Sequence, residues 1–189
     1  MLLQQPGFVR TLARHDRDAT KIEWAHDSAW RFLPPLKSER AGFVLHPVDL
    51  AINKLLALVG RDEPRDYVDI HEVISRVLPL GALSWAASGK DPGYTPALLL
   101  ELLRRRGRYR PADFARLALT EPVDLQALKR RWLDALEAAE RFLATRDPDQ
   151  MGCLYYSPAA GAFVEPKPAQ HVIPHFGRPG GVLPQVTPP

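Results

Sequence analysis

Hydrophobic and polar residues alternate along two segments near the start of the chain, which is the pattern of β-strands. The segments are FVRTLAR (8–14) and ATKIEWA (19–25), and the polar residues HDRD (15–18) between them are typical of a tight turn. The pattern therefore predicts a β-hairpin. The segment DSAWRFLPPLKSERAG (27–42), with its two consecutive prolines, predicts a loop, and GFVLH predicts a further short strand over 42–46.

From residue 47 the apolar residues recur at the three- and four-residue spacing of helices. Val48, Ile52, Leu55 and Val59 predict the buried face of a helix that Asp49 caps and that runs to Gly60. Proline starts, glycine stops and apolar stripes predict further helices over 62–78, 80–88, 95–106, 111–119 and 123–146.

The last part of the chain changes character again. GCLYYSPAAGAFVEP (152–166) predicts a second hairpin with its turn at 157–161. Residues 166–189 are rich in proline and glycine and predict an extended tail that either wraps the domain or is disordered.

The predicted fold class is α+β, with the remnant of a small mixed β-sheet, a mainly helical body, and a C-terminal hairpin with a Pro-rich tail. We divide the chain accordingly into a β-rich part, a helical domain, and a hairpin with its tail: 1–46, 47–150 and 151–189.

Composition narrows the class of protein. The chain has 189 residues, of which 46% are hydrophobic and 25% charged, as in ordinary globular proteins. Its net charge of +3 is compatible with a nucleotide or nucleic-acid partner without requiring one. The single cysteine, Cys153, excludes an internal disulfide. No run approaches the about 18 apolar residues of a membrane span, so we expect a cytoplasmic protein.

The segment DLAINKLLALVGRDEPRDYVDI (49–70) carries the candidate chemistry. Lys54 and Arg61 are seven residues apart and share one helix face, while Asp66 and Asp69 share a face of the next helix. The short linker makes the two helices neighbours. Cations beside carboxylates can hold a nucleoside triphosphate, because the cations bind phosphates and a carboxylate orients the lysine or helps to hold a metal. The alternative is a lattice of surface salt bridges.

This segment resembles the signature of the AbiEii/AbiGii-type nucleotidyltransferase toxins, which belong to the DNA polymerase β-like nucleotidyltransferase superfamily. It contains Asp-Leu-Ala-x-x-Lys, then Arg, then Arg-Asp-x-x-Asp. The resemblance is close over 49–70 and looser over 8–150. It implies a toxin, silenced by a cognate antitoxin, that uses Mg²⁺ and a nucleoside triphosphate (NTP) to transfer a nucleotide to a hydroxyl of RNA, such as tRNA, or of a protein.

The resemblance also implies a role for each matching residue. Lys54 contacts the triphosphate, and Arg61 supports that contact or the acceptor, so both are assigned as nucleotide-binding residues. Asp66 is the catalytic carboxylate that positions the lysine or the substrate. Asp69 and Arg65 are secondary candidates.

Glu23, within the strand 19–25, matches the place of a further catalytic carboxylate in the superfamily. Its alternative is an exposed charge on a hairpin. The family also has a Gly-Ser motif and, about ten residues later, an Asp-x-Asp pair that holds two metal ions. This sequence lacks that motif, and Asp16 and Asp18 fit a turn better than a metal site. We therefore assign no metal ligand.

The missing pair leads us to interpret 1–46 as a partial nucleotidyltransferase core and the chain as truncated. Whether such a chain is active stays open. The alternative function is a non-catalytic helical interaction module or a nucleotide-binding pseudo-enzyme. The remaining sheet would also have an uncovered edge, which predicts self-association. RRRGRYR (104–110) is compatible with an RNA contact, or with arginines that complement a helix C-terminus.

Overall fold

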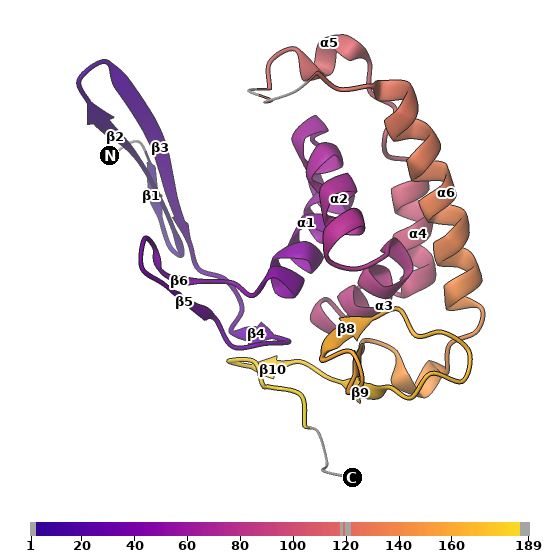
Figure 1. Ribbon diagram of the computed structural model, residues 1–189. Helices are drawn as coiled ribbons and strands as arrows, with labels where there is room; N and C mark the ends of the chain where they lie inside the picture. Colours follow the sequence, from indigo (N-terminus) through magenta and orange to yellow (C-terminus); the bar gives the residue numbers. More distant parts are fainter. Residues whose placement is uncertain (1–2, 118, 120–121, 186–189) are drawn as a thin grey trace.

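The computed structural model describes residues 3–117, 119 and 122–185. Figure 1 shows a helical body (residues 47–143) and a C-terminal segment that runs beneath the helices. Residues 3–25 form a β-arm that projects from one side of this body. The helices are α1 (Pro47–Arg61), α2 (Pro64–Arg76), α3 (Leu80–Lys90), α4 (Pro96–Arg104), α5 (Pro111–Phe114) and α6 (Leu125–Leu143), followed by a 3₁₀ turn, Pro148–Gln150.

The strands form small sheets, and all strand pairs among the described residues are antiparallel. The predicted α+β fold class is thereby confirmed. The strands are β1 (Leu3–Gln5), β2 (Phe8–His15), β3 (Asp18–Ala25), β4 (Trp30–Arg31), β5 (Leu36–Ser38), β6 (Gly42–Val44), β7 (Leu154–Ser157), β8 (Ala162–Val164), β9 (Ile173–His175) and β10 (Arg178–Pro179).

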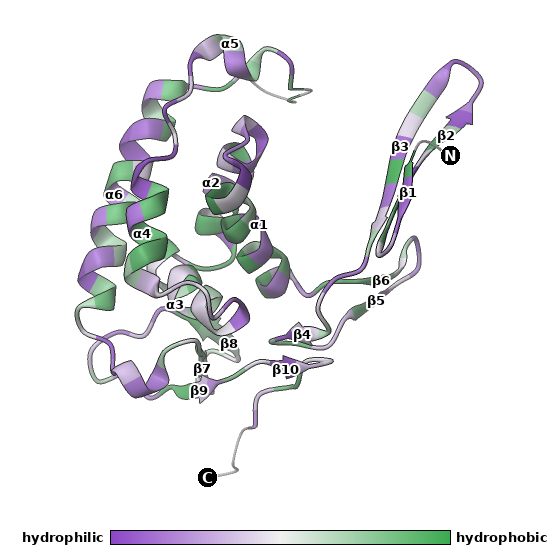
Figure 2. Ribbon diagram, turned by 180° about the vertical axis from the view of Figure 1, so that it is seen from behind, coloured by the Kyte–Doolittle hydropathy of each residue, from purple (hydrophilic) through white to green (hydrophobic). Residues whose placement is uncertain are grey.

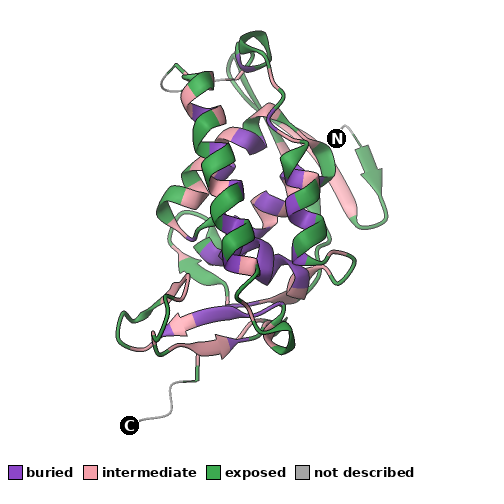
Figure 3. Cartoon of the chain, turned by 90° about the vertical axis from the view of Figure 1, so that its right-hand side faces the viewer, coloured by how far each residue is buried: buried purple, intermediate pink, exposed green. Residues whose placement is uncertain are grey.

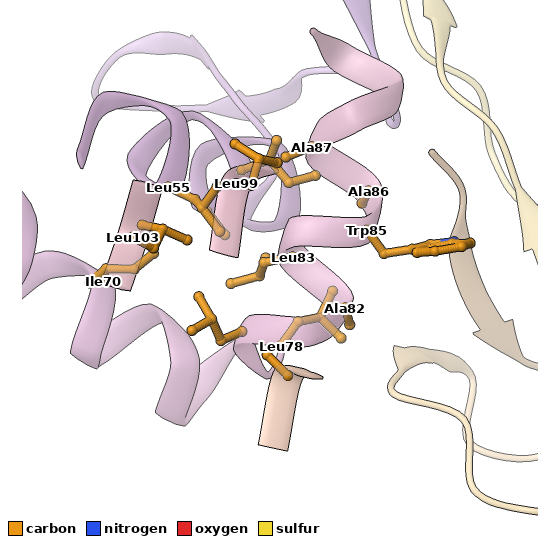
Figure 4. Close-up of a cluster of buried hydrophobic side chains, with 14 of the residues drawn as sticks. Leu55, Ile70, Leu78, Ala82, Leu83, Trp85, Ala86, Ala87, Leu99 and Leu103 are labelled. Carbon is orange, nitrogen blue, oxygen red and sulfur yellow. The ribbon is translucent and has the colours of Figure 1, made fainter. Parts of the chain in front are cut away.

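Helix α3 lies at the centre of the body. Its residues 80–88 are all buried, which explains why it is apolar on every side instead of along one stripe. Around it, Leu55 of α1, Ile70 of α2 and Leu99 of α4 point into one cluster (Figure 4). Trp85 points away from that cluster, and its Nε1 donates to the carbonyl of Gln150 at 2.9 Å.

The outer helices are amphipathic. Purple and green alternate along α6 in Figure 2, because one face of α6 is polar. Its Leu128, Trp132 and Leu136 are buried, as the predicted apolar stripe requires. Buried residues concentrate on the helices in Figure 3, whereas β1, β2 and β3 contain no buried residue.

The start of α1 differs from the prediction that Asp49 caps this helix. The N-cap is His46, whose Nδ1 accepts from the amide of Val48 at 3.3 Å. Asp49 is fully buried and accepts instead from the amides of Phe32 and Leu33, at 2.8 and 3.0 Å. Asp49 therefore fixes an incoming loop on α1, which a local capping rule does not reveal.

Two predicted elements differ from the structure by more than a few terminal residues. The loop predicted over 27–42 contains β4 and β5, since β4 pairs with β10 from the far end of the chain and β5 pairs with β6. The helix predicted over 111–119 is shorter and ends at Phe114, and residue 118 lies outside the described part.

The predicted hairpin near the C-terminus is present as β7 and β8, with the turn between Ser157 and Ala162. The tail wraps the body as far as residue 185: β9 adds to β7, and the amide of Val182 donates to the carbonyl of Phe32 at 3.1 Å. Residues 186–189 of the predicted tail lie outside the described part.

Candidate functional site

The end of α1 and the first turn of α2 are joined by a paired arginine and aspartate. Arg61 Nε and Nη2 donate to the two carboxylate oxygens of Asp66 at 2.6 and 2.8 Å. The Asp66 side chain is fully buried, and the N-terminal turn of α2 favours its negative charge. These hydrogen bonds raise the pKa of the Arg61 guanidinium.

Lys54 lies seven residues before Arg61 on α1 and completes the network. Its Nζ donates to Asp69 Oδ2 at 2.5 Å and lies 3.9 Å from Asp66 Oδ1. We call Lys54, Arg61, Asp66 and Asp69 the α1–α2 charge cluster. It brings together two cations and two carboxylates, as the spacing of these residues in the sequence predicts.

The two cationic groups of the cluster remain accessible. The side chains of Lys54 and Arg61 are 30% and 48% exposed, whereas the Asp66 carboxylate that holds them is covered. The buried carboxylate of Asp66 holds the two cations in a fixed orientation. Each cation also has a close carboxylate partner, Asp69 for Lys54 and Asp66 for Arg61. Arg65 is exposed on α2 and takes no part in these bonds.

A second layer of side chains supports the end of α1. Tyr109 Oη donates to Asp62 Oδ1 at 2.5 Å, and Arg106 Nη1 donates to Asp62 Oδ2 at 3.2 Å. Arg106 Nη2 also donates to the carbonyl of Val59. Asp62 itself adopts a left-handed conformation after α1, with φ at 50°. Burial, reinforced by the bond to Asp62, raises the pKa of Tyr109.

These supporting residues were missed at the sequence level. The segment 104–110 indicates only a basic patch there, and no local pattern links Arg106 or Tyr109 to a residue 44 or 47 positions earlier. The sequence offered one indication, the position of Asp62 in the short linker between two helices. Aspartate at such a position tolerates the left-handed backbone conformation that the structure shows there.

Tyr67, which follows Asp66 on α2, belongs to an aromatic cluster. The Tyr67 ring lies 4.7 Å from the His71 ring, 5.2 Å from Tyr109 and 5.4 Å from Trp132, measured between centroids. Burial, with a smaller contribution from Arg131, lowers the pKa of His71 to about 4. His71 is therefore neutral at pH 7 and adds no cation to the site.

A pocket of about 390 Å³ lies beside the cluster, on the side of Asp69. Its volume falls in the range of small-ligand sites. Side chains from α2 and α6 line it, among them Asp69, His71, Glu72, Ser75, Leu128 and Arg131.

The structure places Glu23 elsewhere. It lies on β3 of the arm, where Glu23 Oε1 accepts from Arg10 Nε at 2.7 Å and lies 3.3 Å from Lys21 Nζ. Both partners lower the pKa of Glu23, with the larger effect from Lys21. Figures 1 and 2 show β3 apart from α1 and α2, so Glu23 is not brought to the charge cluster.

No group of three or more His, Cys, Asp or Glu side chains that could hold a metal ion occurs among the described residues. The carboxylates of the cluster already face Arg61 and Lys54. The residues present therefore do not fit a magnesium site formed by the described chain alone.

The arginines of 104–110 are largely occupied by acidic partners. Arg104 pairs with Glu140, Arg105 with Glu101 and Arg106 with Asp62. The Arg104 pair joins α4 to α6 and the Arg106 pair joins it to the end of α1, whereas the Arg105 pair lies within the last turn of α4. They make the segment mainly structural, with Arg108 and Arg110 outside these pairs.

Comparison with known proteins gives one match. The family model described as nucleotidyl transferase AbiEii toxin, type IV TA system, matches residues 18–159. That range includes the whole α1–α2 charge cluster and Glu23. No curated protein and no solved structure matches the chain. No described helix is both long and apolar enough to cross a membrane.

Proposed function

The chain belongs to the AbiEii nucleotidyl transferase toxin family of type IV toxin–antitoxin systems, and on this premise we propose that the α1–α2 charge cluster binds the triphosphate of a nucleotide. The family implies an NTP substrate, usually a divalent metal, and a cognate antitoxin. The proposed activity is transfer of a nucleotide to a hydroxyl of RNA or protein, in the cytoplasm, where NTPs are available.

The observation that carries this proposal is the buried Asp66 beneath two accessible cations. Arg61 uses two of its donors on Asp66 and has others left for phosphate oxygens. Lys54 uses one bond on Asp69 and likewise keeps donors. The proposed roles are therefore triphosphate binding for Lys54 and Arg61, positioning of both cations for Asp66, and positioning of Lys54 for Asp69.

The proposed reaction is an in-line displacement at the α-phosphorus. The acceptor oxygen forms a bond to this phosphorus, the α–β phosphoanhydride bond breaks, pyrophosphate leaves, and the hydroxyl proton passes to water. Lys54 and Arg61 would stabilise the negative charge that accumulates on the phosphates. We also propose Asp66 and Glu23 as the catalytic carboxylates. Arg65 is a secondary candidate for the same site.

A second candidate function is supported by a specific observation. The described residues include no group of three Asp, Glu, His or Cys side chains that could hold a metal ion, and both carboxylates of the charge cluster are paired with cations. A chain with that site could hold a nucleotide without turning it over. The second candidate is therefore a nucleotide-binding pseudo-enzyme, and a non-catalytic helical module if it binds no nucleotide.

Calorimetric titration with ATP, CTP, GTP and UTP, each with Mg²⁺, tests the binding step. We expect at least one NTP to bind, and Lys54→Ala to weaken that binding tenfold or more, about 1.4 kcal/mol. Lys37→Ala is the matched control, because Lys37 is an exposed lysine on β5. Absence of binding for all four nucleotides would overturn the proposal.

Incubation with α-³²P-labelled NTPs tests the transfer step, with total tRNA and total cell protein as acceptors. Label on either acceptor, lost in Lys54→Ala and kept in Lys37→Ala, supports the transferase. Nucleotide binding that depends on Lys54, without transfer of label, supports the pseudo-enzyme.

A further inference from the structure

The β-arm ends in a strand with an open edge. Its sheet has the order β1-β2-β3, and β3 pairs only with β2 among the described residues. The free edge is eight residues long, Asp18–Ala25, and the arm projects away from the helices in Figures 1 and 2. Long open edges bind further strands unless something blocks them.

The hydrogen-bonding groups on this edge follow from the register of the hairpin. The amide of His26 donates to the carbonyl of Gly7 at 2.7 Å, so His26 belongs to a hydrogen-bonded pair with the β2 side. Because such pairs alternate along an antiparallel ladder, the even residues of β3 face β2. The amides and carbonyls of Ala19, Lys21, Glu23 and Ala25 therefore face the open edge.

The two faces of the arm differ in charge. Residues directly opposite each other share a face of the sheet, and the pairs Val9–Trp24, Thr11–Ile22 and Ala13–Thr20 form one face, which carries no charge until the His15–Asp18 pair beside the turn. The opposite face carries Arg10, Lys21 and Glu23. Trp24 is 55% exposed on the uncharged face. A three-stranded sheet with so little covered surface gains stability from a partner.

We infer that β3 pairs with β3 of a second copy of this chain, antiparallel and with Ile22 opposite Ile22. This register places Lys21 opposite Glu23 and Glu23 opposite Lys21, so two pairs of opposite charges form at once. A two-fold axis at Lys21 would instead oppose two lysines, and an axis at Glu23 would oppose two glutamates. Opposite charges stabilise directly opposed positions and like charges destabilise them.

The backbone groups agree with the same register. Lys21 and Glu23 point their amides and carbonyls outward, so they form hydrogen-bonded pairs across the new interface, while Ile22 forms the non-hydrogen-bonded pair on the axis. The uncharged faces of the two arms join into one continuous surface, on which Trp24 lies opposite Thr20 of the second copy. The two three-stranded sheets become a single sheet, with β3 no longer at an edge.

This pairing uses no residue of the α1–α2 charge cluster, so it can hold or fail independently of the proposed nucleotide binding. Light scattering coupled to size-exclusion chromatography is the first test. We expect a species of twice the 21.2 kDa chain mass that dissociates on dilution. A species of 21.2 kDa at every concentration up to 200 μM, roughly the weak end of specific interfaces, would overturn the inference.

Charge reversal tests the register. Lys21→Glu opposes two glutamates, and Glu23→Lys opposes two lysines, so each single variant should raise the dimer dissociation constant about tenfold or more. The double variant Lys21→Glu/Glu23→Lys restores opposite charges and should regain dimerisation. Lys37→Glu, on an exposed strand of another sheet, is the matched control. Failure of the double variant to regain dimerisation while it remains folded by circular dichroism would rule out this register.

Cysteine cross-linking tests the axis directly. Opposed residues of a non-hydrogen-bonded pair have Cα atoms about 4.5 Å apart, within the range of a disulfide. Ile22→Cys should therefore form a covalent dimer under mild oxidation. In Thr20→Cys the two cysteines would be offset by four residues, about 13 Å, and should not cross-link. The native Cys153 is buried and does not interfere. Equal cross-linking of both variants would contradict the inferred pairing.

Discussion

The Arg61 guanidinium forms a bidentate pair with the Asp66 carboxylate, with donor–acceptor distances of 2.6 and 2.8 Å, and so connects the end of α1 to the first turn of α2. Asp66 is fully buried, and its other cationic neighbour, Lys54 Nζ, lies 3.9 Å away. The pair that we propose to orient the nucleotide-binding cations is thus also a structural contact. Stability measurements and binding measurements can therefore examine the same residues.

Arg61→Ala should lower the free energy of unfolding by about 3 kcal/mol, because it leaves a buried carboxylate without its bidentate partner. Arg61→Lys should recover little of that loss, since an ammonium group cannot make two parallel bonds. Urea unfolding followed by circular dichroism measures both. Arg65 is an exposed arginine next to Asp66 in the first turn of α2, and Arg65→Ala should change the free energy of unfolding by less than about 0.5 kcal/mol. Equal effects of Arg61→Ala and Arg65→Ala would contradict this prediction.

Gly107 is required next to the aromatic cluster. It has φ at +80°, and a Cβ there would lie 2.9 Å from the Tyr67 ring. Gly107→Ala should lower the unfolding free energy by about 2–4 kcal/mol through backbone strain and overpacking together. Gly42→Ala is the matched control, since φ is +73° there and nothing lies within 4 Å of the added atom. Its cost should be about 1 kcal/mol, from backbone strain alone.

The Gly107 and Gly42 variants are compared by thermal and urea unfolding. The difference between their two unfolding free energies isolates the contact with Tyr67. If the two substitutions had the same cost, the Tyr67 ring would have moved aside, and the close packing of 104–110 on α2 would not contribute to stability.

Sequence patterns over a few residues predict the elements that depend on residues close to one another in the sequence. Val48, Ile52, Leu55 and Val59 are all buried, as their helical spacing indicates, and Pro64 begins α2 as a first-turn proline. The charge cluster was predictable for the same reason, because helical spacing and a short linker are sufficient to bring its residues together.

Contacts between distant parts of the chain could not be predicted in this way. Among the described residues β4 pairs only with β10, and Asp49 accepts hydrogen bonds from the amides of Phe32 and Leu33 instead of capping its own helix. Glu23 shows the same limit: its strand was predicted, but the placement of that strand away from α1 depends on how the arm leaves the body.

Tyr109→Phe tests whether the hydrogen bond from Tyr109 to Asp62 stabilises the C-terminal end of α1. The variant keeps the ring packing against Tyr67 but removes the 2.5 Å hydrogen bond to Asp62. Loss of this bond should cost about 1–2 kcal/mol of unfolding free energy, since the acceptor is charged. In an Asp62→Asn background the same substitution should cost less, and a double-mutant cycle measures the difference. Additive effects would mean that the two side chains do not interact in solution.

His71 should make stability depend on pH. Burial holds its pKa at about 4 in the folded chain, below its ordinary value near 6.5. Between these values the unfolded chain binds more protons, so the free energy of unfolding falls as pH falls, by about 2 kcal/mol from pH 7 to pH 5. Urea midpoints across that range measure the slope, which His71→Phe should flatten. His15→Phe should leave the slope unchanged, since His15 is 93% exposed. A slope that His71→Phe does not alter would mean that other groups, such as paired carboxylates, carry the acid sensitivity.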